Sequence, residues 1–172
     1  PVPDVLYAVD AATGEKEWQF DLGEEVQPTS PTVADDFVYV VGDTGDDAVL
    51  HSVDSTTGDS RWARRFRMDG STQAPPTVAD GTVFIIGGRG MIHAAEVTTG
   101  QQRWRFDTGG QPSSAPTVVD GTLFIASSHN PPPQAINGHE DQPGFGISTA
   151  LAGLAGGGYL LRKRLASQEH GE

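Results

Sequence analysis

The sequence contains no cysteine, two lysines and two asparagines among its 172 residues. The absence of cysteine excludes disulfides, thiolate metal sites and cysteine nucleophiles. Acidic side chains number 23 against 11 Lys and Arg, which gives a net charge of −12 at pH 7. A surface of this sign repels a phosphate backbone, so nucleic acid is not an expected partner.

Such an Asp-rich, Lys-poor composition is typical of salt-loving archaea, in which high salt screens self-repulsion. An ordinary acidic protein is the alternative. Glycine (22 residues) and proline (12 residues) are frequent, which indicates many turns. The chain begins at Pro1 without Met or a signal peptide, and we expect a further segment upstream.

The chain is rich in internal repeats. One unit occurs three times, with tryptophans spaced by 44 and 42 residues: LYAVDAATGEKEW (Leu6–Trp18), LHSVDSTTGDSRW (Leu50–Trp62) and IHAAEVTTGQQRW (Ile92–Trp104). A second unit alternates with it: SPTVADDFVYVVG (Ser30–Gly42), PPTVADGTVFIIG (Pro75–Gly87) and APTVVDGTLFIAS (Ala115–Ser127).

Each unit predicts a β-hairpin. In the second unit, Asp80-Gly81 and Asp120-Gly121 are strong two-residue turn signals, and Asp35-Asp36 is a weaker one. The apolar runs after these turns are typical of strands covered on both faces.

In the first unit, Asp10, Asp54 or Glu96 opens a turn. An Asp carboxylate can accept backbone N–H groups there, and the longer Glu does so less well. Glycines at positions 14, 58 and 100 supply the positive φ that the turn needs.

Four short strands every 40-odd residues predict blades of a β-propeller. We expect the tryptophans to lie between neighbouring blades, where burying such a side chain contributes about 3 kcal/mol or more. The small residues Ala8, Ser52 and Ala94 would leave room for the ring to lie flat.

The pattern A-x-D-x-x-T-G-(K/E)-x-x-W resembles the tryptophan-docking motif of quinoprotein propellers, and residues 5–127 look like a PQQ-like (pyrroloquinoline quinone-like) repeat protein. The matching residues are Ala8, Asp10, Thr13, Gly14, Glu15 and Trp18 in the first copy, Asp54, Thr57, Gly58 and Trp62 in the second, and Thr99, Gly100 and Trp104 in the third. The second copy departs at Ser52 and Asp59, and the third at Glu96 and Gln101.

The predicted fold is therefore all-β, a partial propeller of four-stranded antiparallel blades with a C-terminal apolar helix. The expected parts are repeats over 1–127 (half blade 5–22, blade 30–68, blade 75–107, half blade 115–127), a Pro/Gly-rich linker at 128–142, a sorting segment at 143–164 and a polar tail at 165–172. Known propellers have about 4–8 blades. Three blades' worth predicts a fragment, a degenerate remnant, or an open arc that needs a partner chain or the remaining blades.

The resemblance includes quinone-dependent dehydrogenases, so a truncated enzyme is the alternative function. Those enzymes hold Ca²⁺ with Glu, Asn and Asp ligands, use an Asp as base, and many carry a vicinal Cys pair. Here the asparagines are Asn130 and Asn137, both in the predicted linker. We therefore expect no catalytic residue, no metal and no cofactor, with quinone and calcium relevant only to the alternative.

Three further patterns have structural and functional interpretations. Asp43, Asp46 and Asp47 are a solvated loop or a poor Ca²⁺ loop without a closing Glu, and Gly87–Gly90 is a tight turn. His51 and His93 stand at the repeat position of Tyr7, which favours a structural role over metal binding.

Four arginines lie between Arg61 and Arg67, on a predicted outer strand. They either pair with nearby acids or form a docking patch for an acidic partner. Trp62 and Phe66 are four residues apart, whereas Trp18 and Phe20 are two apart, which indicates a two-residue insertion or a bulge.

The last part of the chain predicts its location. After the linker, Pro143, Gly144 and Phe145 precede sixteen uncharged residues, Gly146–Leu161, and the cluster Arg162, Lys163 and Arg164. A helix of this length spans about 25 Å, short of a ~30 Å hydrocarbon core. The basic cluster would remain cytoplasmic, which puts the repeats outside.

This arrangement resembles the PGF-CTERM sorting signal of haloarchaeal surface proteins, which an archaeosortase removes before a lipid anchor is added. The spacer is shorter than is usual, and eight residues follow the basic cluster. A C-terminal helix packed on a partner is the alternative. The sequence thus predicts a non-catalytic cell-surface propeller for binding or scaffolding, anchored at the outer face of the membrane, whose transient partner is the archaeosortase.

Overall fold

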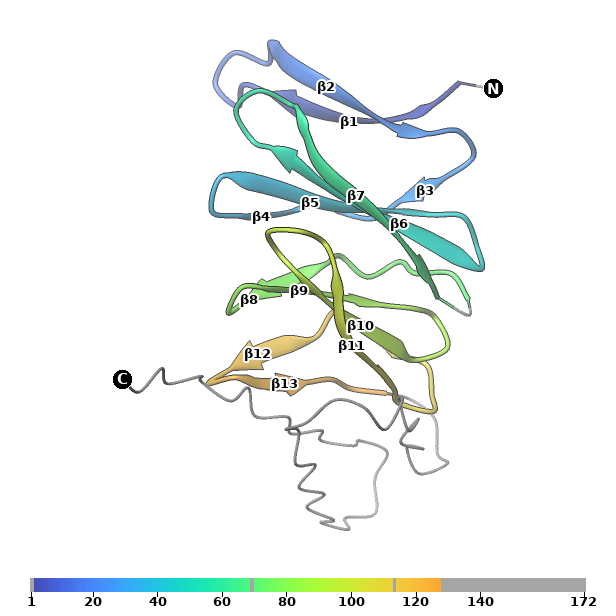
Figure 1. The fold of residues 1–172 in the computed structure, drawn as a ribbon. Helices are drawn as coiled ribbons and strands as arrows, with labels where there is room; N and C mark the ends of the chain where they lie inside the picture. Colours follow the sequence, from blue (N-terminus) through green and yellow to red (C-terminus); the bar gives the residue numbers. More distant parts are fainter. Residues whose placement is uncertain (1, 69, 113, 128–172) are drawn as a thin grey trace.

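The computed structural model describes residues 2–68, 70–112 and 114–127, and all regular structure in that part of the chain is β. Strand bounds and labels follow Figure 1. The strands are β1 (Asp4–Val9), β2 (Lys16–Gly23), β3 (Gln27–Pro28), β4 (Thr32–Ala34), β5 (Phe37–Asp43), β6 (Asp47–Asp54), β7 (Ser60–Arg67), β8 (Thr77–Ala79), β9 (Thr82–Ile86), β10 (Met91–Glu96), β11 (Gln102–Asp107), β12 (Thr117–Val119) and β13 (Thr122–Phe124).

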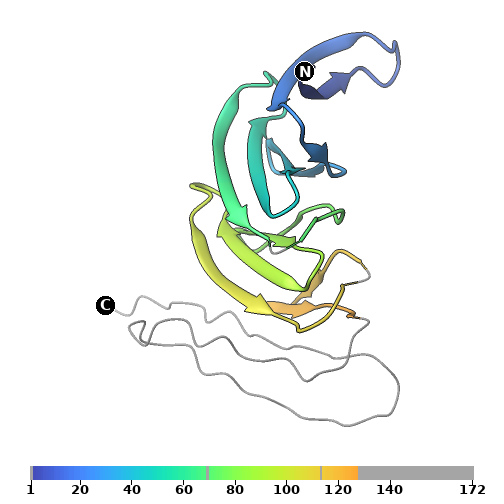
Figure 2. The same ribbon diagram turned by 90° about the vertical axis from the view of Figure 1, so that its right-hand side faces the viewer.

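These strands form two complete blades flanked by two half-blades. The first complete blade contains β3–β7, and the second has the order β11-β10-β9-β8. The first half-blade is β1–β2 and the last half-blade is β12–β13. The sheets stack in chain order, and the half-blades lie at opposite ends of an open arc (Figures 1 and 2). The predicted partial propeller is confirmed, and its terminal halves do not meet within the chain.

The turns of the second repeat unit have the predicted chemistry. Asp80 and Gly81 have φ values of 48° and 67°, and Asp120 and Gly121 have 49° and 67°. Two successive positive φ values define the turn that best matches the twist of a two-residue hairpin. Asp35, in the weaker copy, also has a positive φ of 51°.

The innermost strand of the first complete blade is divided. β3 and β4 both pair with β5, so the blade begins at Gln27 rather than at the predicted residue 30. Thr29 joins the two pieces, because its N–H donates to the Val41 carbonyl at 2.9 Å. The segment before the P-T-V motif therefore belongs to the same sheet.

The unequal spacing of Trp62 and Phe66 reflects a different ladder position of the phenylalanine and no local bulge. The ladder from Asp47–Arg67 to Ser52–Trp62 is regular, and its register shift lies between Ser52 and Val53. Equivalent shifts occur in the β1–β2 and β10–β11 ladders. Phe20 and Phe106 lie opposite Leu6 and Ile92, two residues from the partner of each tryptophan, whereas Phe66 lies opposite Ala48, four residues from Ser52. Strand length does not explain the difference, because β2 has eight residues like β7.

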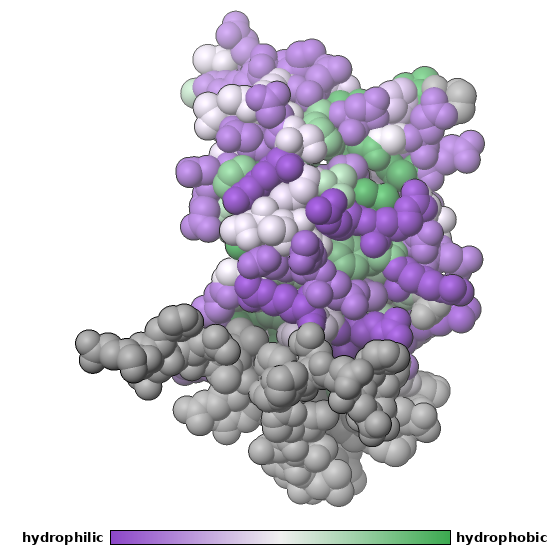
Figure 3. Space-filling model, viewed as in Figure 1, coloured by the Kyte–Doolittle hydropathy of each residue, from purple (hydrophilic) through white to green (hydrophobic). Residues whose placement is uncertain are grey.

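The hydrophobic core is divided among the spaces between blades. One cluster combines Tyr39, Leu50 and Trp62 of the first complete blade with Val83 and Ile85 of the second. Two smaller clusters join the second complete blade to β13, and the first half-blade to β5. In Figure 3, small apolar patches appear between bands of hydrophilic residues that follow the blades. Each blade therefore depends on its neighbour for burial.

The predicted linker, the sorting segment with the apolar helix expected there, and the predicted polar tail lie outside the described residues. The described part of the chain contains no helix with the length and hydropathy needed to span a membrane.

Candidate functional site: tryptophan docking between blades

The turn of the first repeat unit is built around an aspartate. Oδ1 of Asp10 accepts the N–H groups of Ala12 and Thr13 at 2.9 and 2.7 Å. Oδ1 of Asp54 accepts those of Thr56 and Thr57, both at 2.9 Å. These hydrogen bonds lower the pKa of both carboxyls because they stabilise the charged form. The largest contributions come from Thr13 for Asp10 and from Thr57 for Asp54.

Glu96 fills the same position with different contacts. Its Oε2 accepts the Thr99 hydroxyl at 2.8 Å, and its Oε1 lies 3.5 Å from an Arg103 nitrogen. The Thr99 hydrogen bond is the main cause of its lowered pKa, with a smaller contribution from Arg103. The longer side chain reaches past the backbone of its own turn, as expected from the sequence.

Each of these turns in a complete blade receives an indole from the preceding blade. The Trp18 Nε1–H donates to the Ser55 carbonyl at 3.0 Å, and the Trp62 Nε1–H donates to the Val97 carbonyl at 3.0 Å. The acceptors lie directly after Asp54 and Glu96. A turn fixed by its carboxylate therefore presents a carbonyl to the tryptophan of the preceding blade.

The turn glycine is the surface on which the ring lies. A Cβ at Gly58 would be 2.9 Å from Cδ2 of Trp18, and one at Gly100 would be 2.6 Å from Cε3 of Trp62. Side chains cannot approach so closely, so only glycine fits. The sequence predicted the positive φ of these glycines and their place in the docking motif, but not that the indole lies directly on them. The recurring spacing between each tryptophan and the next Thr-Gly pair was the available signal.

The predicted small residues lie directly across the ladder from the tryptophans. Ala8 faces Trp18, and the equivalent pairs are Ser52 with Trp62 and Ala94 with Trp104. Trp62 is 8% exposed and has Tyr39 at a ring distance of 6.0 Å, whereas Trp18 and Trp104 are half-buried. Trp18 and Trp104, which lie where a half-blade meets a complete blade, are thus less buried than Trp62, which lies between the two complete blades.

The two repeat histidines lie in the same contacts, against a phenylalanine of the preceding blade. The Phe20 and His51 rings are 5.5 Å apart, and the Phe66 and His93 rings are 5.3 Å apart. His51 is buried, and burial lowers its pKa because it disfavours the imidazolium. His93 contacts the Gln102 amide oxygen at 2.8 Å and the Arg67 carbonyl at 3.0 Å.

Threonines of the P-T-V motif form a second row of contacts on the innermost strands. The Thr32 hydroxyl donates to the Pro76 carbonyl at 2.6 Å, and the Thr77 hydroxyl donates to the Pro116 carbonyl at 2.9 Å. Each bond joins one blade to the proline that opens the next. The motif was predicted only to start a strand.

The acidic loop has local partners. Asp43 is buried, and its carboxylate accepts the N–H groups of Gly45 and Thr72 at 2.9 and 3.1 Å. Asp47 pairs with Arg65 at 3.2 Å. Across the described ranges, no three His, Asp or Glu side chains come together in a group that could hold a metal ion.

The arginines of β7 make different contacts. Arg65 forms the ion pair with Asp47, and the Arg61 guanidinium lies 4.1 Å from the Phe37 ring centre. This cation–π contact was not anticipated from the sequence. The turn at Gly87–Gly90 is closed by a hydrogen bond of 2.9 Å from the Gly90 N–H to the Gly87 carbonyl, as predicted for a tight turn.

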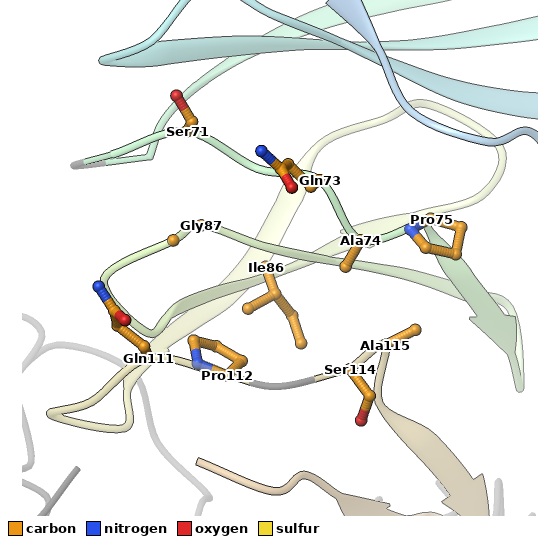
Figure 4. A pocket seen from close by; sticks show the side chains of 11 residues that line it. Ser71, Gln73, Ala74, Pro75, Ile86, Gly87, Gln111, Pro112, Ser114 and Ala115 are labelled. Atoms are coloured by element: carbon orange, nitrogen blue, oxygen red, sulfur yellow. The ribbon is translucent and has the colours of Figure 1, made fainter. Parts of the chain in front are cut away.

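A pocket of about 550 Å³ lies between loops of the second complete blade and the segment before β12 (Figure 4). Its lining is neutral, with Gln73, Gln111 and two serines as the polar side chains around Ile86. A quinone cofactor carries carboxylates that need cations, and its Ca²⁺ needs anionic oxygens. The described lining offers neither, so these residues do not fit such a cofactor.

Several solved structures are similar to this chain. BamB from Moraxella catarrhalis is 27% identical with a TM-score of 0.57, and the match covers 72% of this chain and 41% of that one. Quinohemoprotein alcohol dehydrogenase ADHIIG from Pseudomonas putida HK5 is 21% identical with a TM-score of 0.60, covering 73% and 26%. The second likeness shows the fold alone.

A curated relative is the serine/threonine-protein kinase AfsK of Streptomyces griseus, 33% identical over 114 residues. That match covers 60% of this chain and 13% of AfsK. The chain therefore spans less than half the length of each of these relatives.

The C-terminal segment matches a separate motif. Residues 142–164 correspond to the PGF-CTERM motif, which includes Pro143, Gly144, Phe145 and the basic cluster. The motif indicates a secreted protein anchored at the surface and implies processing by an archaeosortase.

The family of the repeats follows from the sequence match and agrees with the fold. Residues 2–67 and 46–141 match the family described as outer membrane protein assembly factor BamB, which together exceeds half of the chain. In the structure, each sequence repeat corresponds to a stacked sheet whose turn glycine contacts the indole of the preceding blade. The chain belongs to this BamB family of PQQ-like propeller repeats.

Proposed function

We propose that this chain is a non-catalytic binding or scaffolding protein held at the outer face of the cell membrane. The observation that carries the proposal is how its reactive groups are used. The carboxylates of Asp10, Asp54 and Glu96 are engaged in turns, and His51 and His93 pack between blades. Because these carboxylates and imidazoles hold the fold together, we infer that the protein acts through its binding surfaces and not through reactive side chains.

The neutral pocket also supports a non-catalytic role, since general acid–base chemistry needs a titratable group within hydrogen-bond reach. Its test is direct. The purified protein is mixed with pyrroloquinoline quinone and Ca²⁺, and binding is followed by calorimetry alongside dye-linked oxidation of alcohols. We expect neither heat of binding nor turnover. Saturable binding with turnover would replace this proposal by the dehydrogenase.

The anchoring part of the proposal assigns roles to the C-terminal motif. Pro143, Gly144 and Phe145 would be recognised by the archaeosortase, the uncharged segment would enter the membrane, and Arg162, Lys163 and Arg164 would stay on the cytoplasmic side. A lipid anchor would then retain the repeats outside. The BamB relatives are described as outer membrane assembly factors, and no such task is transferred to this chain.

Mass spectrometry of the mature protein tests the anchoring. We expect the native chain to end before the apolar segment and to carry a lipid mass. The triple variant P143A/G144A/F145A should keep Glu172 and lose the lipid, whereas changing Gln134, which precedes the matched motif, to Ala should alter neither. An intact, lipid-free native chain would contradict the proposed processing.

A further inference from the structure

The outer strands of the two complete blades concentrate positive charge in an acidic chain. β7 carries four arginines and no acid, and β11 carries two arginines and Asp107. Together they hold six of the seven arginines among the described residues, and the seventh is Arg89. Both strands lie on the convex side of the arc (Figures 1 and 2), where Figure 3 shows strongly hydrophilic bands. This side attracts anions although the net charge of the chain is −12.

One of these arginines occupies a position that holds a phenylalanine in the other copies of the repeat. Arg64 comes two residues after the tryptophan of its copy and lies opposite Leu50 in the ladder. Phe20 and Phe106 come two residues after theirs and hold the equivalent ladder position. Since two copies form the same hairpin with a ring at this place, the fold does not require the arginine.

A second arginine lies on the facing side of the next blade. Arg105 is directly across the ladder from His93, whose ring packs 5.3 Å from the ring of Phe66 on β7. Arg64 is two residues from Phe66 and therefore on the same face of β7. A Cβ at Gly100 in the second blade would be 2.6 Å from the Arg64 Cγ. We call the line where β7 meets the second complete blade the outer seam, and both arginines lie on it.

The two arginines of the outer seam have no carboxylate partner across the described residues. The Arg64 guanidinium donates to the carbonyl of its neighbour Ala63 at 3.1 Å, and Arg105 is exposed. Arg65 and Arg103, by contrast, each form an ion pair within the chain. A guanidinium group without a counter-ion can bind the carboxylate of another molecule through two parallel hydrogen bonds.

β7 also offers a strand edge beside these arginines. It is the last strand of its sheet, with β6 on one side and no strand on the other among the described residues. An extended peptide can add to such an edge through main-chain hydrogen bonds, while its side chains alternate between the two faces. A polysaccharide or a lipid surface could use the charges but not this edge. Charge and strand edge together therefore favour a protein segment.

We propose that an extended, acidic segment of a partner protein binds along the outer edge of β7 and places carboxylates on Arg64 and Arg105. This interaction depends on the proposed binding function and gives it a class of partner. Every second side chain of the segment would face the outer seam, so alternating acidic residues fit best. Because both arginines are exposed, added salt weakens the complex.

Calorimetry on the full chain tests the choice of partner. The probe is a synthetic peptide of four Glu-Thr repeats, which matches the eight residues of β7, and its neutral control has four Gln-Thr repeats. We expect saturable binding of the acidic peptide alone. The acidic peptide with every backbone nitrogen methylated keeps its charge but loses its main-chain donors, and should bind about tenfold more weakly. Equal binding of the methylated peptide would overturn the pairing with β7. Tighter binding of dextran sulfate or of phosphatidylglycerol vesicles would overturn the protein segment.

Variants of the outer seam locate the site. Arg64→Phe restores the residue of the other copies and should weaken peptide binding roughly threefold to tenfold without lowering the melting temperature. Arg105→Gln should weaken binding by a similar factor. Arg89→Gln is the control, since it removes the same charge from an exposed arginine outside both strands and should leave the affinity unchanged.

Two outcomes would overturn the site. One is a native chain that does not bind the acidic peptide, and the other is equal affinity in the Arg64→Phe, Arg105→Gln and Arg89→Gln variants. Neither outcome alters the response of the native chain to quinone and Ca²⁺, which tests its non-catalytic role separately.

Discussion

The first half-blade and the first complete blade share a sequence pattern and differ in how much of it is buried. The docking turn is the same in both, with an aspartate that accepts two N–H groups and a glycine of φ near 75°. The side chains along the strand are buried only in the complete blade. Local sequence is thus sufficient for the turn, whereas burial comes from the neighbouring sheet.

Removing an indole should have the largest effect where two complete blades meet. Trp62→Ala is expected to lower the free energy of unfolding by about 3–5 kcal/mol, because Trp62 is 8% exposed and its ring fills the space over Gly100. Trp18→Ala, at the half-buried contact of the half-blade, should cost roughly half as much. Urea denaturation of both variants measures the difference. Equal losses would show that the half-blade is as firmly attached as a complete blade.

The next largest effect separates two roles of the turn glycine: its left-handed backbone conformation and its contact with the indole. Gly81 and Gly100 have the same φ of 67°, but only Gly100 lies under an indole, and Gly81 has open surroundings like Gly14. Gly81→Ala should cost about 1–2 kcal/mol, the cost of a left-handed backbone. Gly100→Ala should cost about 3 kcal/mol, since the methyl group also displaces Trp62. Matching values in thermal melts would remove the docking role of the glycine.

A smaller, pH-dependent effect should come from His51, whose equivalent in the half-blade is the exposed Tyr7. Burial lowers the pKa of His51 in the folded chain below its usual 6.5, so protons bind the unfolded chain more readily. Stability is therefore full above pH 6.5 and falls as the pH decreases below it. His51→Phe, which keeps a ring against Phe20, should flatten this part of the profile. A profile identical to that of the native chain would assign the loss to other groups.

The smallest effect should come from the exposed turn carboxylates. Asp54→Ala should lower the melting temperature slightly at pH 7, because Thr56 and Thr57 lose an acceptor. The folded pKa of Asp54 is below its usual 3.8, so its contribution is present above that pH and is lost as the pH falls further. The melting temperatures of the variant and the native chain should converge in acid. A gap that persists there would point to lost packing.

The repeated motifs predicted the strands, the turns and the position of the indoles between blades. They did so because each depends on short-range chemistry, as in Asp80-Gly81 and Asp10 with its two N–H donors. The different ladder position of Phe66 was also readable from its spacing to Trp62, although not its distinction from a bulge.

The contacts that join one blade to the next could not be predicted residue by residue. The position of Gly100 under Trp62, of Phe20 against His51 and of Thr32 against Pro76 depends on how successive sheets are rotated and offset. That relation is set by the sum of many packing contacts, and a single repeat does not contain it.

The row of threonine hydroxyls on prolines has an evolutionary consequence. Because Thr32 meets Pro76 in the same manner as Thr77 meets Pro116, a unit added by duplication brings both the donor for the unit that follows and the acceptor for the one before. When a whole unit is gained or lost, each threonine hydroxyl therefore still meets a proline carbonyl of the adjacent unit. Genes of this kind can change length in steps of about forty codons and still encode a chain that folds.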